Sequence, residues 1–180
     1  MSVHGLPVRT ASLVLRRFVP EDAPVLMGLN GEPSTRAWLP SHVYATATEA
    51  ATVLARLIAN YSSPGNPRVG PYVIGVAHCG SGELIGHVGF SPLRGEVEVS
   101  YAICEAARGH GYGSEALVQA CLWAARAFAL DEIVAVTASA NAASRRTLAR
   151  ASFMHSSDEL RRFQGREQAV SRYVWRAPRD

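Results

Sequence analysis

The sequence predicts one α/β domain built around a mixed, mostly antiparallel sheet that is flanked by helices. Residues 72–103 contain three strand-like runs separated by turns, and residues 114–156 contain a helix, a strand, a second helix and another strand. The chain has 180 residues, of which 48% are hydrophobic and 18% are charged. That size and composition are typical of a single globular domain over residues 1–180.

The first third of the chain predicts a strand and two helices. Leu13–Phe18 alternates weakly and contains Val and Leu, which favours a strand. The run Pro20-Glu21-Asp22 is a helix start, so a helix should extend from there to about Leu29. A second helix is expected from about Thr48 to Ala59, because its alanines and leucines recur at helical spacing. Ser62–Pro71 contains three prolines and two glycines, which indicates a loop.

The middle of the chain predicts an antiparallel meander. Tyr72–His78, Leu84–Ser91 and Glu96–Ile103 are strand-like, and the short segments between them, Cys79–Gly82 and Pro92–Gly95, contain turn residues. The remaining predicted elements are a helix from about Ser114 to Phe128, a strand at Ile133–Thr137, a helix from Asn141 to about Ala151, and strands at Phe153–Ser156 and Ser171–Trp175.

Several classes of protein are disfavoured by composition. Met1–Pro20 has no apolar run long enough for a signal peptide, and the apolar segment Leu117–Leu130 is too short to span a membrane. We therefore expect a cytoplasmic protein that binds no membrane. Cys79, Cys104 and Cys121 lack the spacing of metal ligands, so we expect reduced thiols and no bound metal.

All 18 basic residues are arginine. Without lysine, the chain has no phosphate-binding loop of the type that requires one. No run of arginines is interleaved with aromatic residues, so we expect no nucleic-acid partner.

The segment from Arg108 to Ser114 is the strongest functional signal. It holds three glycines between a predicted strand and a long predicted helix. The N–H groups at a helix start lack partners within the helix, and glycines allow a phosphate to approach the backbone closely. A pyrophosphate is therefore the expected ligand. The dinucleotide pattern G-x-G-x-x-G is absent because Ala116 occupies the third glycine position, which disfavours a nucleotide-dependent oxidoreductase.

The run Arg108-Gly-His-Gly-Tyr-Gly113 resembles the R/Q-x-x-G-x-G/A signature of the GNAT acetyltransferase superfamily. The resemblance covers nearly the whole chain and implies a GNAT-like fold with a splayed fourth strand. It also implies that acetyl-coenzyme A is the co-substrate. The residues implied to bind it in this segment are Arg108, Gly109, His110, Gly111, Tyr112, Gly113 and Ser114. Ile103, at the end of the splayed strand, is implied to bind the pantetheine arm.

Three further segments are similar to the Rim-type branch, whose members acetylate ribosomal proteins. They are Leu13-Val-Leu-Arg16 with Glu21-Asp22, Glu98-Val-Ser-Tyr101, and Asn141-Ala-Ala-Ser144. The resemblance implies an amine acceptor, either a protein α-amino group or a small-molecule amine. A non-catalytic GNAT fold that binds acyl-coenzyme A as a sensor or scaffold is the alternative. The protein is expected to be a monomer or a homodimer.

Many members of this family donate a proton to the leaving thiolate from a tyrosine seven residues after the asparagine, but that position here is Leu148. Ser144 is the best substitute, because Asn141 and Ser144 lie one helical turn apart and face the sulfur by resemblance. A serine hydroxyl can donate a hydrogen bond to the thiolate. Alternatively, both residues only cap the helix.

Glu98 is the first candidate for the general base, because burial in a strand that lines the acceptor site would raise its pKa. Glu96 points to the same face, and one of the two acids can be simply exposed. Tyr101 lies on the opposite face by alternation unless a bulge intervenes. A water molecule could carry the proton instead.

The remaining candidates have weaker assignments. Trp38, with Pro40 and His42 nearby, is expected to wall the acceptor pocket, or else to belong to the core. His110 should lie near phosphate or solvent, and His155 is expected to be an ordinary strand residue. Arg145 and Arg146 could reach a 3′-phosphate, although an exposed helix face is the simpler expectation.

Overall fold

The computed structural model describes residues 5–178. The strands are β1 (Val8–Arg9), β2 (Leu13–Arg16), β3 (Tyr72–His78), β4 (Leu84–Leu93), β5 (Glu96–Ile103), β6 (Glu132–Ala138), β7 (Met154–Phe163) and β8 (Arg166–Arg176). The α-helices are α1 (Ala23–Gly31), α2 (Pro33–Trp38), α3 (Ala47–Ala59), α4 (Tyr112–Phe128) and α5 (Ala142–Arg150). Short 3₁₀ turns occur at Pro20–Asp22, Pro40–His42 and Glu105–Ala107. Among residues 5–178, no helix is both long and apolar enough to span a membrane.

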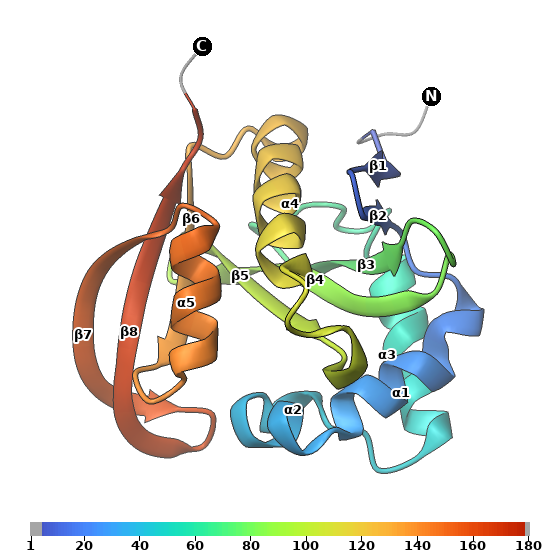
Figure 1. The fold of residues 1–180 in the computed structure, drawn as a ribbon, viewed down its shortest axis with the longest axis horizontal. Coiled ribbons are helices and arrows are strands. Elements are labelled where there is room, and N and C mark those ends of the chain that lie inside the picture. The colour runs from blue at the N-terminus through green and yellow to red at the C-terminus, as the bar shows by residue number, and fades with distance from the viewer. Residues whose placement is uncertain (1–4, 179–180) are drawn as a thin grey trace.

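The eight strands form one sheet in the order β1-β2-β3-β4-β5-β6-β8-β7 (Figure 1). Neighbouring strands are antiparallel except for β5 and β6, which are parallel. Strands β3, β4 and β5 form the predicted meander. The predicted α/β class and the mostly antiparallel sheet are confirmed.

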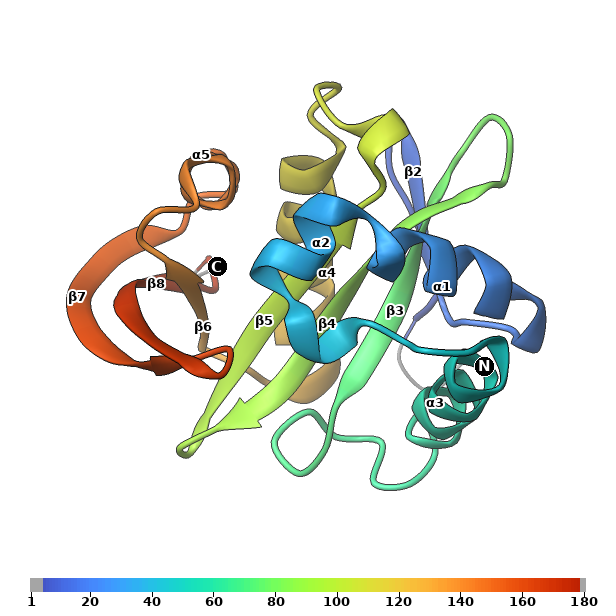
Figure 2. The same ribbon diagram turned by 90° about the horizontal axis from the view of Figure 1, so that it is seen from below.

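Helices cover both faces of this sheet (Figures 1 and 2). On one face α4 packs its apolar side against the central strands, where Tyr72, Phe90 and Trp123 belong to the main core. On the other face lie α1, α2 and α3, and a smaller core there includes Leu26 and Leu54. Helix α4 also contacts β5, which is the fourth predicted strand.

Strands β5 and β6 diverge soon after they meet. A single register pair, Glu98 with Val134, joins them, whereas β4 and β5 pair continuously from Gly86–Ile103 to Leu93–Glu96. The splay expected at the fourth strand is thus present, and it opens a V in the middle of the sheet. Because backbone groups inside the V have no strand partner, a ligand with its own amide groups can pair there.

The segment that opens the chain differs from the prediction. A single helix was expected from Pro20 to about Leu29, but residues 20–22 form a 3₁₀ turn and α1 follows as a separate helix. Helix α2 was not predicted. Glu32 is extended, with ψ of 144°, because it precedes Pro33, and Pro33 then starts the new helix.

The sequence Leu13-Val-Leu-Arg16 with Asp22 has a structural role. Arg16 donates from Nη1 and Nη2 to the two carboxylate oxygens of Asp22, each at 2.8 Å, and the Val19 N–H also donates to Asp22. Burial opposes ionisation of this carboxyl group, but these hydrogen bonds hold its pKa below the usual value. The pair fixes the start of α1 against β2.

The C-terminal hairpin is longer than predicted. A strand was expected at Phe153–Ser156, but Phe153 is buried ahead of β7, and β7 continues to Phe163. Its residues are mostly exposed, so they lack the apolar alternation that identifies a half-buried strand. Strand β8 likewise begins at Arg166 rather than Ser171.

Candidate active site

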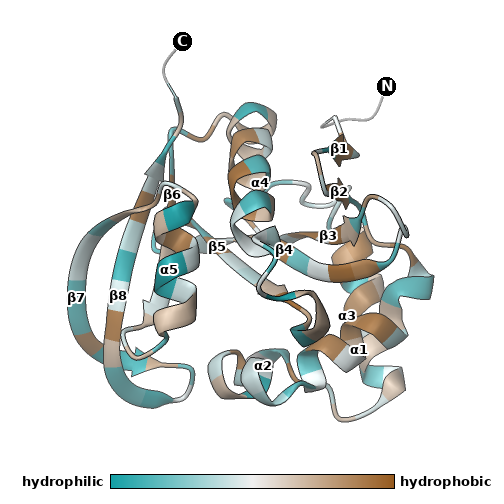
Figure 3. Cartoon of the chain, in the orientation of Figure 1, coloured by the Kyte–Doolittle hydropathy of each residue, from teal (hydrophilic) through white to brown (hydrophobic). Residues whose placement is uncertain are grey.

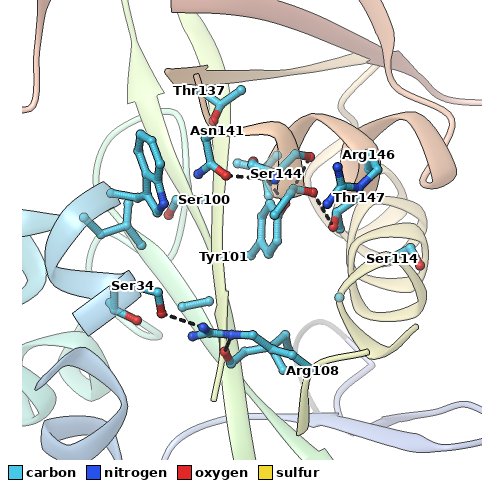
Figure 4. A pocket seen from close by; sticks show the side chains of 18 of the residues that line it. Ser34, Ser100, Tyr101, Arg108, Ser114, Thr137, Asn141, Ser144, Arg146 and Thr147 are labelled. Atoms are coloured by element: carbon cyan, nitrogen blue, oxygen red, sulfur yellow. Dashed lines mark hydrogen bonds between the residues drawn. The ribbon is translucent and has the colours of Figure 1, made fainter. Parts of the chain in front are cut away.

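A cleft of about 530 Å³ lies at the V between β5 and β6. Its walls come from α2, β5, the glycine segment, the end of β6, α5 and the tip of the β7–β8 hairpin. Figure 4 shows side chains from α2, β5, the glycine segment, the end of β6 and α5 around one space. The predicted site residues that line it are Glu98, Ile103, Arg108, Gly109, Gly111, Tyr112, Gly113, Ser114, Asn141 and Ser144.

The glycine segment shapes the N-terminus of α4. Helix α4 begins at Tyr112, two residues earlier than predicted, and Gly111 is its N-cap with φ of +84°. This left-handed conformation suits glycine, and glycine supplies no side chain to occupy the N–H groups of the first turn. Gly113 faces α5, where an added Cβ would lie 3.3 Å from Thr147 Cγ2. The helix start is therefore open toward the cleft and can bind an anion.

Arg108 connects the two sides of the cleft. Its Nε donates to the Ile103 carbonyl at 2.8 Å, and its Nη2 donates to Glu32 Oε2 at 2.7 Å. Nη1 donates to the Ser34 hydroxyl at the start of α2 (Figure 4). Glu32 also accepts the Glu105 N–H at 2.9 Å. The guanidinium thus ties the glycine segment to α2.

Ser144 lies at the start of α5 with a tyrosine hydroxyl beside it. Asn141 caps the helix by accepting the Ser144 N–H at 3.0 Å, so its predicted capping role is present. The Ser144 hydroxyl is free of that cap and lies 3.1 Å from the Tyr101 hydroxyl (Figure 4). Burial raises the pKa of Tyr101, although its hydrogen bonds to Ser144 and Thr147 oppose that shift. Two neutral hydroxyl groups therefore face the cleft as possible hydrogen-bond donors.

Tyr101 was set aside in the sequence because it alternates with Glu98. The register between β4 and β5 has no bulge, so the two side chains do point to opposite faces. Both nevertheless line the cleft, since the V exposes both faces of β5. Whether a side chain of β5 reaches the cleft depends on the separation of β5 from β6, and the alternation of side chains along β5 does not reveal that separation.

Glu98 lies where β5 and β6 separate. Burial raises the pKa of its carboxyl group, while Arg161 and a hydrogen bond from the Val136 backbone lower it in part. The direction is upward, as the sequence predicted. Glu96 is different: it is exposed and pairs with Arg172 at 2.6 Å, so it is the solvent-facing member of the two acids.

The far wall of the cleft carries Trp38, which was expected to line a pocket, and also His42, whereas Pro40 does not line the cleft. Burial lowers the pKa of His42, whose ring centroid is 6.0 Å from that of His87 on β4. His87 is only 3% exposed, and neither ring nitrogen has a hydrogen-bond partner among the described residues. Burial, with a smaller effect of His42, lowers the pKa of His87 to about 3. Both imidazoles are therefore neutral near pH 7.

Three candidate residues lie outside the cleft. His110 is exposed and stacks on Tyr112 with ring centroids 5.4 Å apart. Arg145 donates from Nε to the Tyr173 hydroxyl at 3.2 Å, and His155 contacts Asp158 at 3.1 Å. Of the arginine pair, Arg146 lines the cleft and Arg145 does not.

Sequence reasoning also missed part of the wall. Ser34, Phe163 and Gln164 line the cleft, although none was a candidate. Ser34 belongs to the unpredicted helix α2, and the other two lie at the tip of a hairpin whose length was underestimated. No chemical motif surrounds Phe163 and Gln164, so the only sequence signal for them was Gly165, which marks the turn of the hairpin.

Comparison with known proteins found a matching family model and similar solved structures. The family model for the acetyltransferase (GNAT) domain matches residues 12–154. No curated protein matches the chain significantly in sequence. Among solved structures, a GNAT-family acetyltransferase from Bacillus anthracis has a TM-score of 0.81 at 16% identity, covering 95% of this chain and 98% of its own.

Two other similar structures are those of a ribosomal-protein acetyltransferase and of a protein in complex with a form of coenzyme A. A ribosomal-protein-S5-alanine acetyltransferase from Vibrio fischeri has a TM-score of 0.80 at 16% identity, over 95% of this chain and 96% of that one. RimJ from Mycobacterium smegmatis, in complex with CoA-disulfide, has a TM-score of 0.77 at 17% identity, over 92% and 82%. At these identities the likeness establishes the fold. Because the family model covers most of its length, the chain belongs to the GNAT acetyltransferase family.

Proposed function

We propose that this GNAT acetyltransferase moves the acetyl group of acetyl-coenzyme A to a primary amine by direct attack on the thioester. One observation carries the proposal. A single cleft has the open N-terminus of α4 at one end and runs along the splay between β5 and β6. The helix start suits a pyrophosphate. The unpaired backbone of β5 up to Ile103 suits the amides of a pantetheine arm.

The reaction needs a neutral amine, stabilisation of the developing oxyanion, and a donor for the departing sulfur. The amine nitrogen forms a bond to the carbonyl carbon, and the bond from that carbon to sulfur breaks. We assign the Ser144 hydroxyl as hydrogen-bond donor to the thiolate, with the Tyr101 hydroxyl 3.1 Å behind it. We assign Glu98 as the group that accepts the proton of the amine, directly or through one water.

The acceptor is proposed to be a protein α-amino group or a small-molecule amine. The Rim-type motifs and the likeness to a ribosomal-protein acetyltransferase support the first choice. Trp38 and His42 wall the side of the cleft proposed for the acceptor. The three cysteines are all unpaired, which suits the reducing cytoplasm in which we place the reaction.

A non-catalytic protein that binds acyl-coenzyme A is the second candidate. The family's usual tyrosine position is Leu148, which is 1% exposed and belongs to the core. Catalytic turnover distinguishes the acetyltransferase from the non-catalytic binding protein. Thiol release from acetyl-coenzyme A should be measured against N-terminal peptides, polyamines and aminoglycosides, and binding without release for every acceptor would favour the sensor.

The Ser144→Ala variant tests the assigned donor. We expect kcat to fall roughly ten-fold with little change in cofactor affinity, because the thiolate charge develops only in the reaction. Ser139→Ala is a suitable control, since Ser139 lies just after β6 and contacts Ser171 instead. Steady-state kinetics and cofactor titration give the two quantities. A wild-type kcat in Ser144→Ala would show that Ser144 has only a structural role in α5.

A further inference from the structure

The outer edge of β7 is the longest free strand edge of the described chain. β7 is last in the sheet order, and among residues 5–178 no segment pairs with its outer side (Figure 1). Its register with β8 is regular from Asp158–Ser171 to Phe163–Arg166, because the irregularity lies earlier, between His155 and Ser157. Free N–H and C=O groups along such an edge are able to pair with another strand.

The residues of this strand are mainly polar, and its apolar residues are Met154, Leu160 and Phe163 (Figure 3). Leu160 is 69% exposed and Met154 is 68% exposed, so β7 holds two of the large hydrophobic side chains most exposed to solvent. Charged residues on an edge strand commonly prevent pairing. Whether they do so here depends on the order of the charges.

That order is complementary to itself. Leu160 is preceded by Asp158 and Glu159 and followed by Arg161 and Arg162. In an antiparallel pair of two β7 strands with a two-fold axis through Leu160, Asp158 lies opposite Arg162 of the partner subunit, and Glu159 lies opposite Arg161 of the partner subunit. Each strand of such a pair presents acids to arginines at every charged position.

The alternation of side chains sorts these charges onto two faces. Asp158, Leu160 and Arg162 share one face, so two leucines would meet at the axis with an ion pair on either side. Arg162 is exposed and has no hydrogen bond or ion pair among the described residues. Asp158 accepts the Ser171 hydroxyl at 2.6 Å and contacts His155 Nε2 at 3.1 Å, both through Oδ1. The side chain is 61% exposed, and Oδ2 is left available for a further contact.

On the opposite face, Arg161 already contacts Glu159 of its own chain at 3.0 Å. Pairing would convert this contact into a network of four alternating charges. We propose that two copies of this chain associate through antiparallel pairing of their β7 edges about a two-fold axis at Leu160, extending the sheet across the dimer. A two-fold contact of this kind uses the same patch on both subunits and closes on itself.

The contact would also reach the active site. Phe163, which lies at the end of β7, lines the cleft, and the proposed register places it opposite Ser157 of the partner subunit. Pairing would therefore hold the hairpin tip that forms one wall. The proposed dimer does not depend on the acyl acceptor or on the roles of Ser144 and Glu98.

The dimer should be weak, because only about seven residues on each strand meet and stable interfaces usually bury more than ~1,200 Å². We expect a Kd in the range of roughly 10–100 µM, to be measured by sedimentation velocity from low micromolar to several hundred micromolar protein. Monomer throughout that range would overturn the proposal.

Charge reversal gives a test of register. Arg162→Glu places a carboxylate opposite Asp158 of the partner subunit, and Asp158→Arg places two guanidinium groups opposite each other. Each variant alone should dimerise at least about ten-fold more weakly than the wild type. An equimolar mixture of the two should recover the wild-type affinity as a heterodimer, because opposite charges then face each other at both ends.

The double variant Asp158→Arg/Arg162→Glu should likewise recover the homodimer. Arg56→Glu, on the exposed surface of α3, makes the same change in net charge as Arg162→Glu but away from β7, and it should leave the Kd unchanged. Circular dichroism shows whether each variant is folded. A wild-type dimer whose Kd is the same in both single variants would place the contact elsewhere and refute the β7 pairing.

Discussion

The carboxyl group of Glu98 is held at the point where two parallel strands begin to separate. Burial raises its pKa, and Arg161 with the Val136 N–H opposes that rise. A carboxylate poised above its normal pKa can accept a proton from an amine more readily. The same contacts would also suit a residue that merely satisfies the open edge of β6.

Glu98→Gln separates these roles. If Glu98 is the base, kcat/KM should rise with pH in the wild type, and the variant should lose this limb with a roughly 10²–10⁴-fold lower rate. Acceptors whose amine pKa values differ by about two units show whether the limb belongs to the amine instead. Glu96→Gln, on the same strand but exposed, is the matched control. A limb that follows the acceptor and survives in Glu98→Gln would assign Glu98 to binding or structure.

His87 predicts a second pH effect, on stability. Its pKa is about 3 in the folded protein against an ordinary value of 6.5 for a solvated histidine, so the unfolded chain binds the proton more readily. The stabilisation from a neutral His87 is thus complete above pH 6.5 and is lost as pH falls toward 3, by about 1.4 kcal/mol per pH unit. His42, whose pKa is also lowered, adds in the same direction.

His87→Leu should remove the contribution of His87 to the pH dependence of stability, because it places an apolar side chain that does not titrate at this buried position. Between about pH 6.5 and 5, urea unfolding should show the free energy of unfolding falling more steeply for the wild type than for the variant, by roughly 2 kcal/mol over the interval. His110→Leu, at an exposed position, controls for the loss of a histidine. Equal pH slopes for all three proteins would show that His87 is solvated in solution.

At the scale of elements, the start of α4 is the proposed binding site for the pyrophosphate of the cofactor. Acetyl-coenzyme A should raise the Tm of the wild type, because a ligand of the folded state stabilises it. Gly113→Val should abolish most of that rise, since even a Cβ would lie 3.3 Å from Thr147 and further carbons would fill the gap between α4 and α5. Gly111→Val should do the same and should also strain a residue at φ of +84°.

Gly82→Val is the matched control for strain. Gly82 has φ of +74° in open space on the β3–β4 turn and does not line the cleft. It should lower the Tm of the free protein yet keep the full shift on adding acetyl-coenzyme A. A normal shift in folded Gly111→Val and Gly113→Val would place the pyrophosphate elsewhere.

Elements were predictable from sequence where burial imposes a pattern. Helices α3 and α4 and strand β5 have one face more buried than the other, so their apolar residues repeat with the period of the element. Strands β3 and β4 are buried on both faces, and they were recognisable as apolar runs bounded by turn residues. Strand β7 has almost no buried face, and its pairing partner alone makes it a strand. Helix α2 has six residues and depends on Pro33 to start it, so periodicity had too little length to report it.

At the scale of the whole molecule, the glycine motif lies in the wall of one cleft, and ten predicted site residues line that cleft. His110 does not, because its ring turns outward to stack on Tyr112. Tyr101 and Phe163 were not predicted, because their approach to the cleft depends on the angle between strands and on the reach of the C-terminal hairpin. Both are long-range properties that no local pattern encodes.

The single register pair between β5 and β6 also has a consequence for amide hydrogen exchange. Amides of residues 100–103 that do not face β4 lack a strand partner, so they should exchange rapidly in deuterated solvent although the sheet around them is stable. Coenzyme A bound along the V should slow these amides roughly ten-fold or more, while amides of the β3–β4 pair keep their rates. Mass spectrometry of peptides spanning β5 and β6 would record the change. Protection confined to other strands would mean that the cofactor does not occupy the gap in the sheet.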